Sequence, residues 1–91
     1  MNLLEKLFKG EKVLHFTLID PEDQSPSEAG RRAKLCENYG TDAIMVGGST
    51  IKETKVVDET VKEIKNKVNL PIILFPNSSQ AISQFADYIF F

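Results

Sequence analysis

Short apolar runs alternate with longer amphipathic stretches along this 91-residue chain. Residues 13–19, 42–46 and 71–75 are rich in β-branched and aromatic side chains, and residues 88–91 resume the pattern. Such runs predict β-strands that are buried on both faces. Pro21 and Pro76 follow the first and third runs and are expected to end them, because proline has no N–H for a sheet ladder.

Residues 25–40 predict a helix with a signal at each end. Ser25 is a good N-cap, Pro26 suits the first helical position, and Glu28 completes a capping box with Ser25. Gly40 predicts the end of this helix, because glycine readily adopts the left-handed cap conformation.

Apolar residues at intervals of three and four predict three more helices. The clearest is a long helix whose apolar face consists of Val57, Val61, Ile64 and Val68. A short helix is expected around residues 82–85, capped by Asn77 or Ser78. Residues 3–8 form an apolar stripe that can pack on the protein itself, which we favour, or make peripheral contact with a membrane.

The order of these elements is one helix, three strand–helix units and a final strand. Alternation of this kind requires a parallel sheet with crossover helices, so the chain is expected to be an α/β protein. Strand starts near residues 13, 42 and 71 match the roughly 30 residues per unit of a TIM (β/α)8 barrel of about 250 residues. We therefore expect residues 1–91 to be one partial domain, the N-terminal half, α-(βα)3-β, of such a barrel, without its C-terminal half.

Composition excludes some classes of function. The chain is 42% hydrophobic and 26% charged, and its net charge of −2 comes without a basic stripe, so no nucleic-acid partner is expected. Cys36 is the only cysteine, which excludes an internal disulfide and fits a cytoplasmic location. Cys36 is interpreted as a small buried hydrophobe, and His15 as a packed strand histidine rather than a catalytic base.

Ligands of parallel α/β folds bind beyond the carboxyl ends of the strands, where Asp20 follows the first run. A carboxylate at the mouth of an apolar barrel suits a hard cation such as Mg²⁺. The alternative is a helix or turn cap, because Asp-Pro is also a turn signal.

The second apolar run ends in Gly47, Gly48, Ser49 and Thr50. Glycines let the backbone approach a ligand closely, and their N–H groups, with the two hydroxyls, can hold phosphate oxygens or the water shell of a metal ion. The alternative is an N-cap for the following helix. Asn77 occupies the same place after the third run and is a further candidate for binding substrate.

Four blocks in this order resemble one enzyme family. They are residues 17–21 (Thr-Leu-Ile-Asp-Pro), 40–50 (Gly-Thr-Asp-Ala-Ile-Met-Val-Gly-Gly-Ser-Thr), 70–76 (Leu-Pro-Ile-Ile-Leu-Phe-Pro) and 86–91 (Ala-Asp-Tyr-Ile-Phe-Phe). The chain resembles the geranylgeranylglyceryl phosphate synthases and their bacterial relatives, the heptaprenylglyceryl phosphate synthases. The second block is the most specific of the four.

The resemblance implies a Mg²⁺-dependent prenyltransferase of ether phospholipid synthesis. Its substrates would be sn-glycerol 1-phosphate and a polyprenyl diphosphate, and the whole enzyme would be a homo-oligomer. The metal positions of the family match Asp20 and Ser49, with Thr50 a less favoured neighbour. Asn77 stands in a loop that departs from the Phe-Pro-Gly-Asn common in relatives.

The resemblance places the glycerol phosphate site mainly on strands after residue 91, so this chain alone is expected to be inactive. No catalytic residue is identified, and the prenyl chain length stays open. Two alternatives remain: another phosphate-handling barrel enzyme, and a non-catalytic half-barrel that associates with itself.

Overall fold

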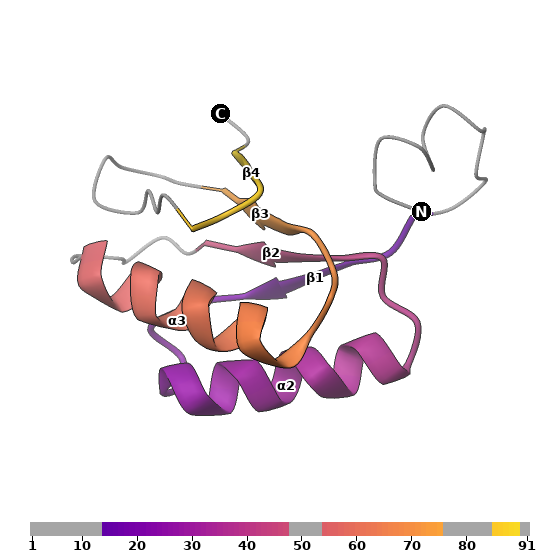
Figure 1. The fold of residues 1–91 in the computed structure, drawn as a ribbon, viewed down its shortest axis with the longest axis horizontal. Helices are drawn as coiled ribbons and strands as arrows, with labels where there is room; N and C mark the ends of the chain where they lie inside the picture. The colour runs from indigo at the N-terminus through magenta and orange to yellow at the C-terminus, as the bar shows by residue number, and fades with distance from the viewer. Residues whose placement is uncertain (1–13, 48–53, 76–84, 90–91) are drawn as a thin grey trace.

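The computed structural model describes residues 14–47, 54–75 and 85–89. Four parallel strands form one sheet in the order β1-β2-β3-β4 (Figure 1). The strands are β1 (Phe16–Ile19), β2 (Ala43–Val46), β3 (Ile72–Leu74) and β4 (Tyr88–Ile89), and the helices are α2 (Pro26–Asn38) and α3 (Thr54–Lys67). Each strand lies at or inside the range that its apolar run predicts.

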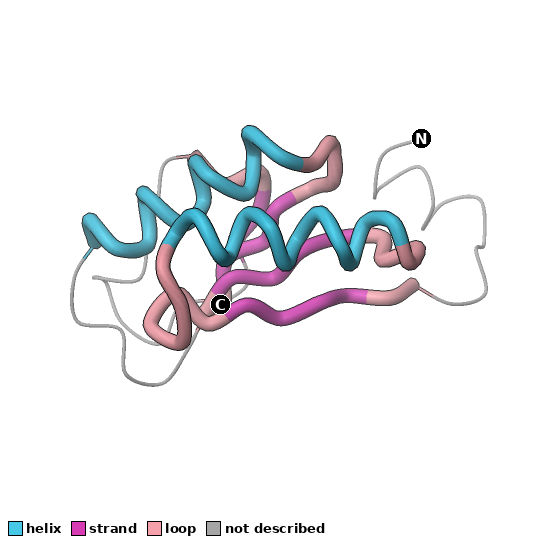
Figure 2. The backbone as a smooth tube through the Cα atoms, turned by 90° about the horizontal axis from the view of Figure 1, so that it is seen from below, coloured by secondary structure: helices cyan, strands magenta, loops and turns pink. Residues whose placement is uncertain are grey.

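Both helices lie on the same face of the sheet (Figures 1 and 2). Helix α2 connects β1 to its neighbour β2, and α3 connects β2 to β3. The predicted α/β class and the parallel sheet are therefore confirmed. The helices predicted at residues 3–8 and around residue 82 lie outside the described residues.

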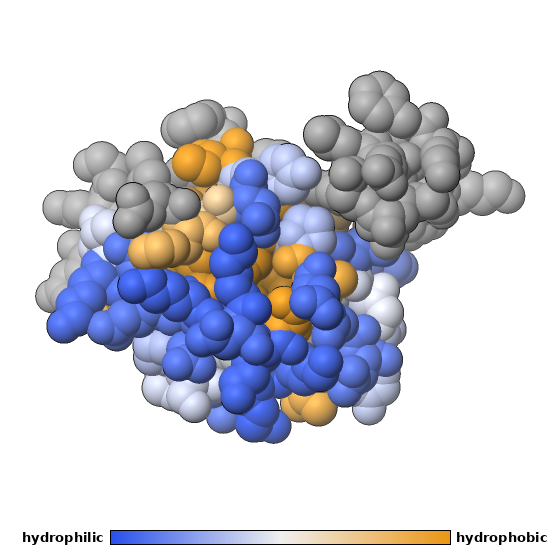
Figure 3. Space-filling view, viewed as in Figure 1, coloured by the Kyte–Doolittle hydropathy of each residue, from blue (hydrophilic) through white to orange (hydrophobic). Residues whose placement is uncertain are grey.

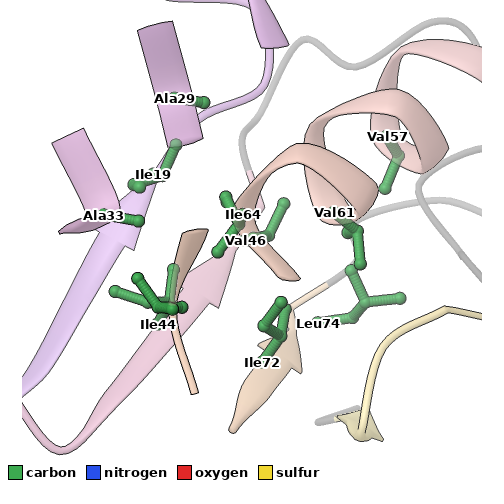
Figure 4. Close-up of a cluster of buried hydrophobic side chains, with 11 residues drawn as sticks. Ile19, Ala29, Ala33, Ile44, Val46, Val57, Val61, Ile64, Ile72 and Leu74 are labelled. Carbon is green, nitrogen blue, oxygen red and sulfur yellow. The ribbon is translucent and has the colours of Figure 1, made fainter. Parts of the chain in front are cut away.

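The core lies between the sheet and α3. Val57, Val61 and Ile64 of α3 are fully buried, and Val68 after the helix is 6% exposed, so the predicted apolar face is confirmed. They pack with side chains from the helix-facing side of the strands, namely Ile19, Ile44, Val46, Ile72 and Leu74 (Figure 4). Burial of each such side chain stabilises the fold by about 1.5–3 kcal/mol.

Small residues let α2 approach α3 closely. Ala29, Gly30 and Ala33 are the buried residues of α2. A Cβ atom added to Gly30 would lie 3.0 Å from the carbonyl oxygen of Glu63 and 3.1 Å from Cγ of Lys67. Cys36 is half-buried against the same core, which fits its interpretation as a small hydrophobe.

Helix α2 begins and ends as its sequence predicts. The Ser25 side chain accepts a hydrogen bond from the Glu28 N–H (3.1 Å), and Gly40 has the left-handed φ of 96°. The Glu28 carboxylate pairs with Arg31 and Arg32, so only the Ser25 half of the capping box is formed. The hydrogen bonds from Arg31 hold the pKa of Glu28 below its usual value.

Aspartates fix the strand register at the amino edge of the sheet. Asp42 donates its N–H to the His15 carbonyl (2.8 Å) and accepts the His15 N–H on Oδ2 (2.9 Å). Asp87 makes the same pair of bonds to Ile72, each 2.9 Å long. The prediction of a packed strand histidine is wrong, because His15 lies before β1 with its side chain exposed and bonds to Asp42 through its backbone.

The sheet face opposite the helices is only partly covered. Ala43 and Ile73 are buried there with Leu14, Met45 and Tyr88 packed around them. Phe16 is 39% exposed and Leu18 64% exposed, so the prediction that β1 is buried on both faces is wrong. A strand inside a parallel sheet needs a layer on each face, and the described helices supply only one.

The surface formed by the two described helices is largely hydrophilic. Blue, hydrophilic side chains dominate the surface formed by α2 and α3, as Figure 3 shows. Neither described helix is long and apolar enough to span a bilayer.

Candidate active site

The carboxyl ends of β1, β2 and β3 meet at one edge of the sheet. The register pairs Ile19 with Val46, and Val46 with Leu74, so the next residues are Asp20, Gly47 and Phe75. Sequence reasoning placed Asp20 and Gly47 together at such an edge, and the structure confirms that placement. The other predicted site residues, Gly48, Ser49, Thr50 and Asn77, lie outside the described residues.

Asp20 caps the turn that follows β1. Its Oδ1 accepts the Glu22 N–H (2.9 Å), and its backbone carbonyl accepts the Asp23 N–H (3.1 Å) and Nε2 of Gln24 (2.6 Å). Asp20 therefore acts as the turn cap that the sequence offered as an alternative to a metal ligand. Within residues 14–47, 54–75 and 85–89, Oδ2 of Asp20 makes no hydrogen bond.

A partly exposed carboxylate of this kind suits Mg²⁺. In the described part of the chain, no group of three or more His, Cys, Asp or Glu side chains could hold a metal ion. Mg²⁺ does not need such a cage, because it keeps several waters and binds through one or two carboxylates together with substrate phosphates. Asp20 is thus compatible with a Mg²⁺ ion that a diphosphate shares.

Gly47 has a packing role that sequence reasoning missed. Its N–H donates to the Ile19 carbonyl (3.2 Å), so the sheet already uses the group that was expected to face a phosphate. A Cβ atom at position 47 would lie 2.4 Å from the Phe75 carbonyl oxygen, closer than real Cβ atoms come. Glycine is needed here because the backbone of Phe75 passes close to residue 47. A contact between Gly47 and substrate remains a prediction.

Two polar residues near Asp20 also escaped the sequence analysis. Gln24 bonds the Asp20 carbonyl at one end of its amide and Nη1 of Arg32 (2.9 Å) at the other. The three residues therefore form a chain of contacts from the end of β1 to the second turn of α2. The position of Gln24 directly before the N-cap could have drawn attention to it. Its hydrogen-bond partners, however, follow only from the structure.

A parallel sheet with both described helices on one face is the arrangement of part of an α/β barrel. The profile of the PcrB family matches residues 6–91, which is nearly the whole chain. The chain belongs to the PcrB family.

Curated relatives share one name. Geranylgeranylglyceryl phosphate synthase from Pyrococcus abyssi is 56% identical over 91 residues, which are 100% of this chain and 36% of the relative. The enzyme of that name from Pyrococcus horikoshii is 58% identical over 87 residues, covering 96% of this chain and 34% of the relative. The chain thus spans about a third of the length of the curated relatives it matches.

Solved structures agree with these matches. Wild-type GGGPS from Thermoplasma volcanium superposes with a TM-score of 0.88 at 47% identity, covering 98% of this chain and 36% of that one. (S)-3-O-geranylgeranylglyceryl phosphate synthase from Thermoplasma acidophilum, in complex with its substrate sn-glycerol-1-phosphate, gives 0.89 at 44% identity, covering 99% and 37%. The described fold is therefore a partial TIM barrel.

The Pyrococcus abyssi relative makes a sharp test of Gly47 feasible. In a full-length chimera, residues 1–91 replace the matching 36% of that relative. We expect Gly47→Ala in this chimera to lower the free energy of unfolding by about 1–3 kcal/mol, because the added methyl group overpacks the junction of β2 and β3. Thermal or denaturant unfolding measures the loss.

Gly30→Ala is the matched control for this prediction. Its Cβ meets the Glu63 carbonyl oxygen at 3.0 Å rather than 2.4 Å. Inside a helix, alanine also gains about 1 kcal/mol over glycine, which offsets the tighter contact. Gly30→Ala is therefore expected to cost less stability than Gly47→Ala. The reverse order would contradict the packing role of Gly47.

Proposed function

We propose that these 91 residues are the N-terminal part of a prenyltransferase that joins sn-glycerol 1-phosphate to a polyprenyl diphosphate. The observation that carries the proposal is Asp20, a carboxylate at the carboxyl edge of a partial barrel, of which only Oδ1 is hydrogen-bonded among the described residues. Support also comes from the name shared by relatives at 56–58% identity and from a similar structure in complex with sn-glycerol-1-phosphate. These names favour this function over other phosphate-handling barrel enzymes.

The reaction forms one bond and breaks another. One of the two free hydroxyl oxygens of sn-glycerol 1-phosphate attacks carbon 1 of the prenyl diphosphate, and the hydroxyl proton passes to solvent. The bond from carbon 1 to the diphosphate oxygen breaks, and pyrophosphate leaves with the electron pair. The ether product is the precursor of a phospholipid.

The proposed role of Asp20 is to hold Mg²⁺, with Ser49 as a second ligand. When bound, Mg²⁺ neutralises the charge that develops on the departing pyrophosphate. The Glu22 N–H on Oδ1 keeps the Asp20 carboxylate in place, so its geometry is set before the substrate arrives. Gly47, Gly48, Thr50 and Asn77 are proposed to contact substrate.

The remaining features of the proposal concern the whole protein. We propose a cytoplasmic homo-oligomer that contacts the membrane peripherally, because its prenyl substrate and its product are lipids. The single Cys36, half-buried against the core, is compatible with a reducing compartment.

The test is an assay of the full-length chimera. We expect it to convert sn-glycerol 1-phosphate and geranylgeranyl diphosphate into the ether product, detected by mass spectrometry, and to lose this activity when a chelator removes divalent metal. A series of shorter and longer prenyl diphosphates then gives the preferred chain length. A chimera that melts cooperatively but forms no ether with any of these donors would contradict the proposal.

A further inference from the structure

Gln24 links the loop after β1 to helix α2 with both ends of its amide. Nε2 donates to the Asp20 carbonyl at 2.6 Å, and Oε1 accepts from Nη1 of Arg32 at 2.9 Å. The guanidinium group of Arg32 has only donors, and a carbonyl has only acceptor sites. The amide of Gln24 is therefore oriented in one sense, with Oε1 toward Arg32 and Nε2 toward Asp20.

These contacts hold the backbone of Asp20 next to the Cα atom that carries its side chain. The Asp20 carbonyl is held by Gln24 and by the Asp23 N–H, and Oδ1 is held by the Glu22 N–H. With the carbonyl and Oδ1 both fixed, the direction of Oδ2 is fixed as well. A metal ligand must be held within about 0.5 Å of its productive position, and supporting hydrogen bonds usually hold it there.

We propose that Gln24, oriented by Arg32, is a positioning residue that aims the Asp20 carboxylate at the metal. This inference rests on the proposed function, because it takes Asp20 to be a Mg²⁺ ligand. Gln24 itself touches neither metal nor substrate in this proposal. It acts through the Asp20 backbone, and its hydrogen bonds to Asp20 and Arg32 are the observations that carry it.

Gln24→Glu distinguishes a positioning role from a purely electrostatic effect, because the two predict opposite changes in metal affinity. Glutamate keeps an oxygen for Arg32 but loses the donor to the Asp20 carbonyl. An added negative charge beside a cation site should strengthen metal binding, whereas loss of the donor should misalign Asp20 and weaken it. We expect weaker binding by about tenfold or more, as is typical when an outer partner of a metal ligand is removed.

The measurement is the affinity of the full-length chimera for Mn²⁺ in the presence of inorganic pyrophosphate. Electron paramagnetic resonance detects the bound Mn²⁺ directly. Binding is read without turnover, so a loss of activity from other causes does not affect it. A companion assay varies Mg²⁺, and we expect Gln24→Glu to need more Mg²⁺ for half-maximal rate while the KM for sn-glycerol 1-phosphate stays unchanged.

Two arginines on α2 supply a matched pair of controls. Arg31 and Arg32 both pair with Glu28, but only Arg32 reaches Gln24. We expect Arg32→Met to weaken Mn²⁺ binding severalfold and Arg31→Met to leave it unchanged. This pair also decides the question if Gln24→Glu fails to fold, because it leaves residue 24 intact. Equal effects of the two methionine variants would overturn the role of Arg32.

The outcomes distinguish this inference from the proposed function. A wild-type chimera that forms ether, together with Gln24→Glu that binds Mn²⁺ as tightly as wild type or more tightly, would overturn the positioning role alone. A folded wild-type chimera that binds no Mn²⁺ with pyrophosphate would overturn both the metal site and the inference. Weaker Mn²⁺ binding in Gln24→Glu and Arg32→Met, with Arg31→Met unaffected, supports the inference.

Discussion

Asp20→Asn in the full-length chimera is expected to lower kcat by about a hundredfold or more, the scale of losing one element of transition-state charge stabilisation. Asparagine keeps an oxygen that can accept the Glu22 N–H, so the turn after β1 is preserved. What it removes is the negative charge that a Mg²⁺ ligand needs. Initial rates at saturating substrates, measured over a range of Mg²⁺ concentrations, give the effect.

Asp23→Asn is the matched control for this substitution. Asp23 lies in the same turn and is exposed, and its backbone N–H, which the substitution leaves in place, bonds to the Asp20 carbonyl. We expect Asp23→Asn to retain the wild-type rate within about two- to threefold, since a surface charge has a small effect. If Asp20→Asn turned over as fast as Asp23→Asn, Asp20 would not be a metal ligand. Thermal melts confirm that both variants fold.

Much of the fold could be predicted because it follows from local patterns. The intervals between Val57, Val61 and Ile64 give the buried face of α3 directly. The start of α2 depends on Ser25, whose side chain accepts a hydrogen bond from the N–H of the residue three positions later. The end of α2 depends on the left-handed backbone conformation of Gly40. Interactions within a few residues leave a signature in the sequence, and strand–helix alternation then favours a parallel sheet.

Contacts between distant residues had no such signature. The approach of Phe75 to Gly47 and the bonds from Asp42 to His15 arise only when neighbouring strands align. Sequence therefore did not reveal that the sheet uses the Gly47 N–H, and it placed His15 within a strand. The bonds of Gln24 are different, because its partners Asp20 and Arg32 are near in sequence, yet neither residue type carries a pattern that pairs them before the turn is formed.

The open side of the sheet is the feature with the largest consequence for the isolated chain. Phe16, Leu18 and Phe75 expose 39%, 64% and 54% of their surface. The outer edges of β1 and β4 have no strand partner among the described residues. Each large apolar side chain left in water forgoes about 1.5–3 kcal/mol, and unpaired edges invite pairing with another chain. Scaled by these exposed fractions, the three side chains together forgo about 2–5 kcal/mol, a large share of the stability of a typical domain, about 5–15 kcal/mol.

We therefore expect the 91-residue polypeptide on its own to self-associate and to form no prenyl ether. Analytical ultracentrifugation across a concentration series measures the first property, and the mass-spectrometric assay measures the second. Leu18→Lys should shift the distribution toward monomer, because it removes the most exposed apolar side chain of the described strands. Asn66→Lys adds the same charge to an exposed site on α3 and should leave association unchanged. A monodisperse wild-type monomer with a cooperative melt would show that the open face does not drive association.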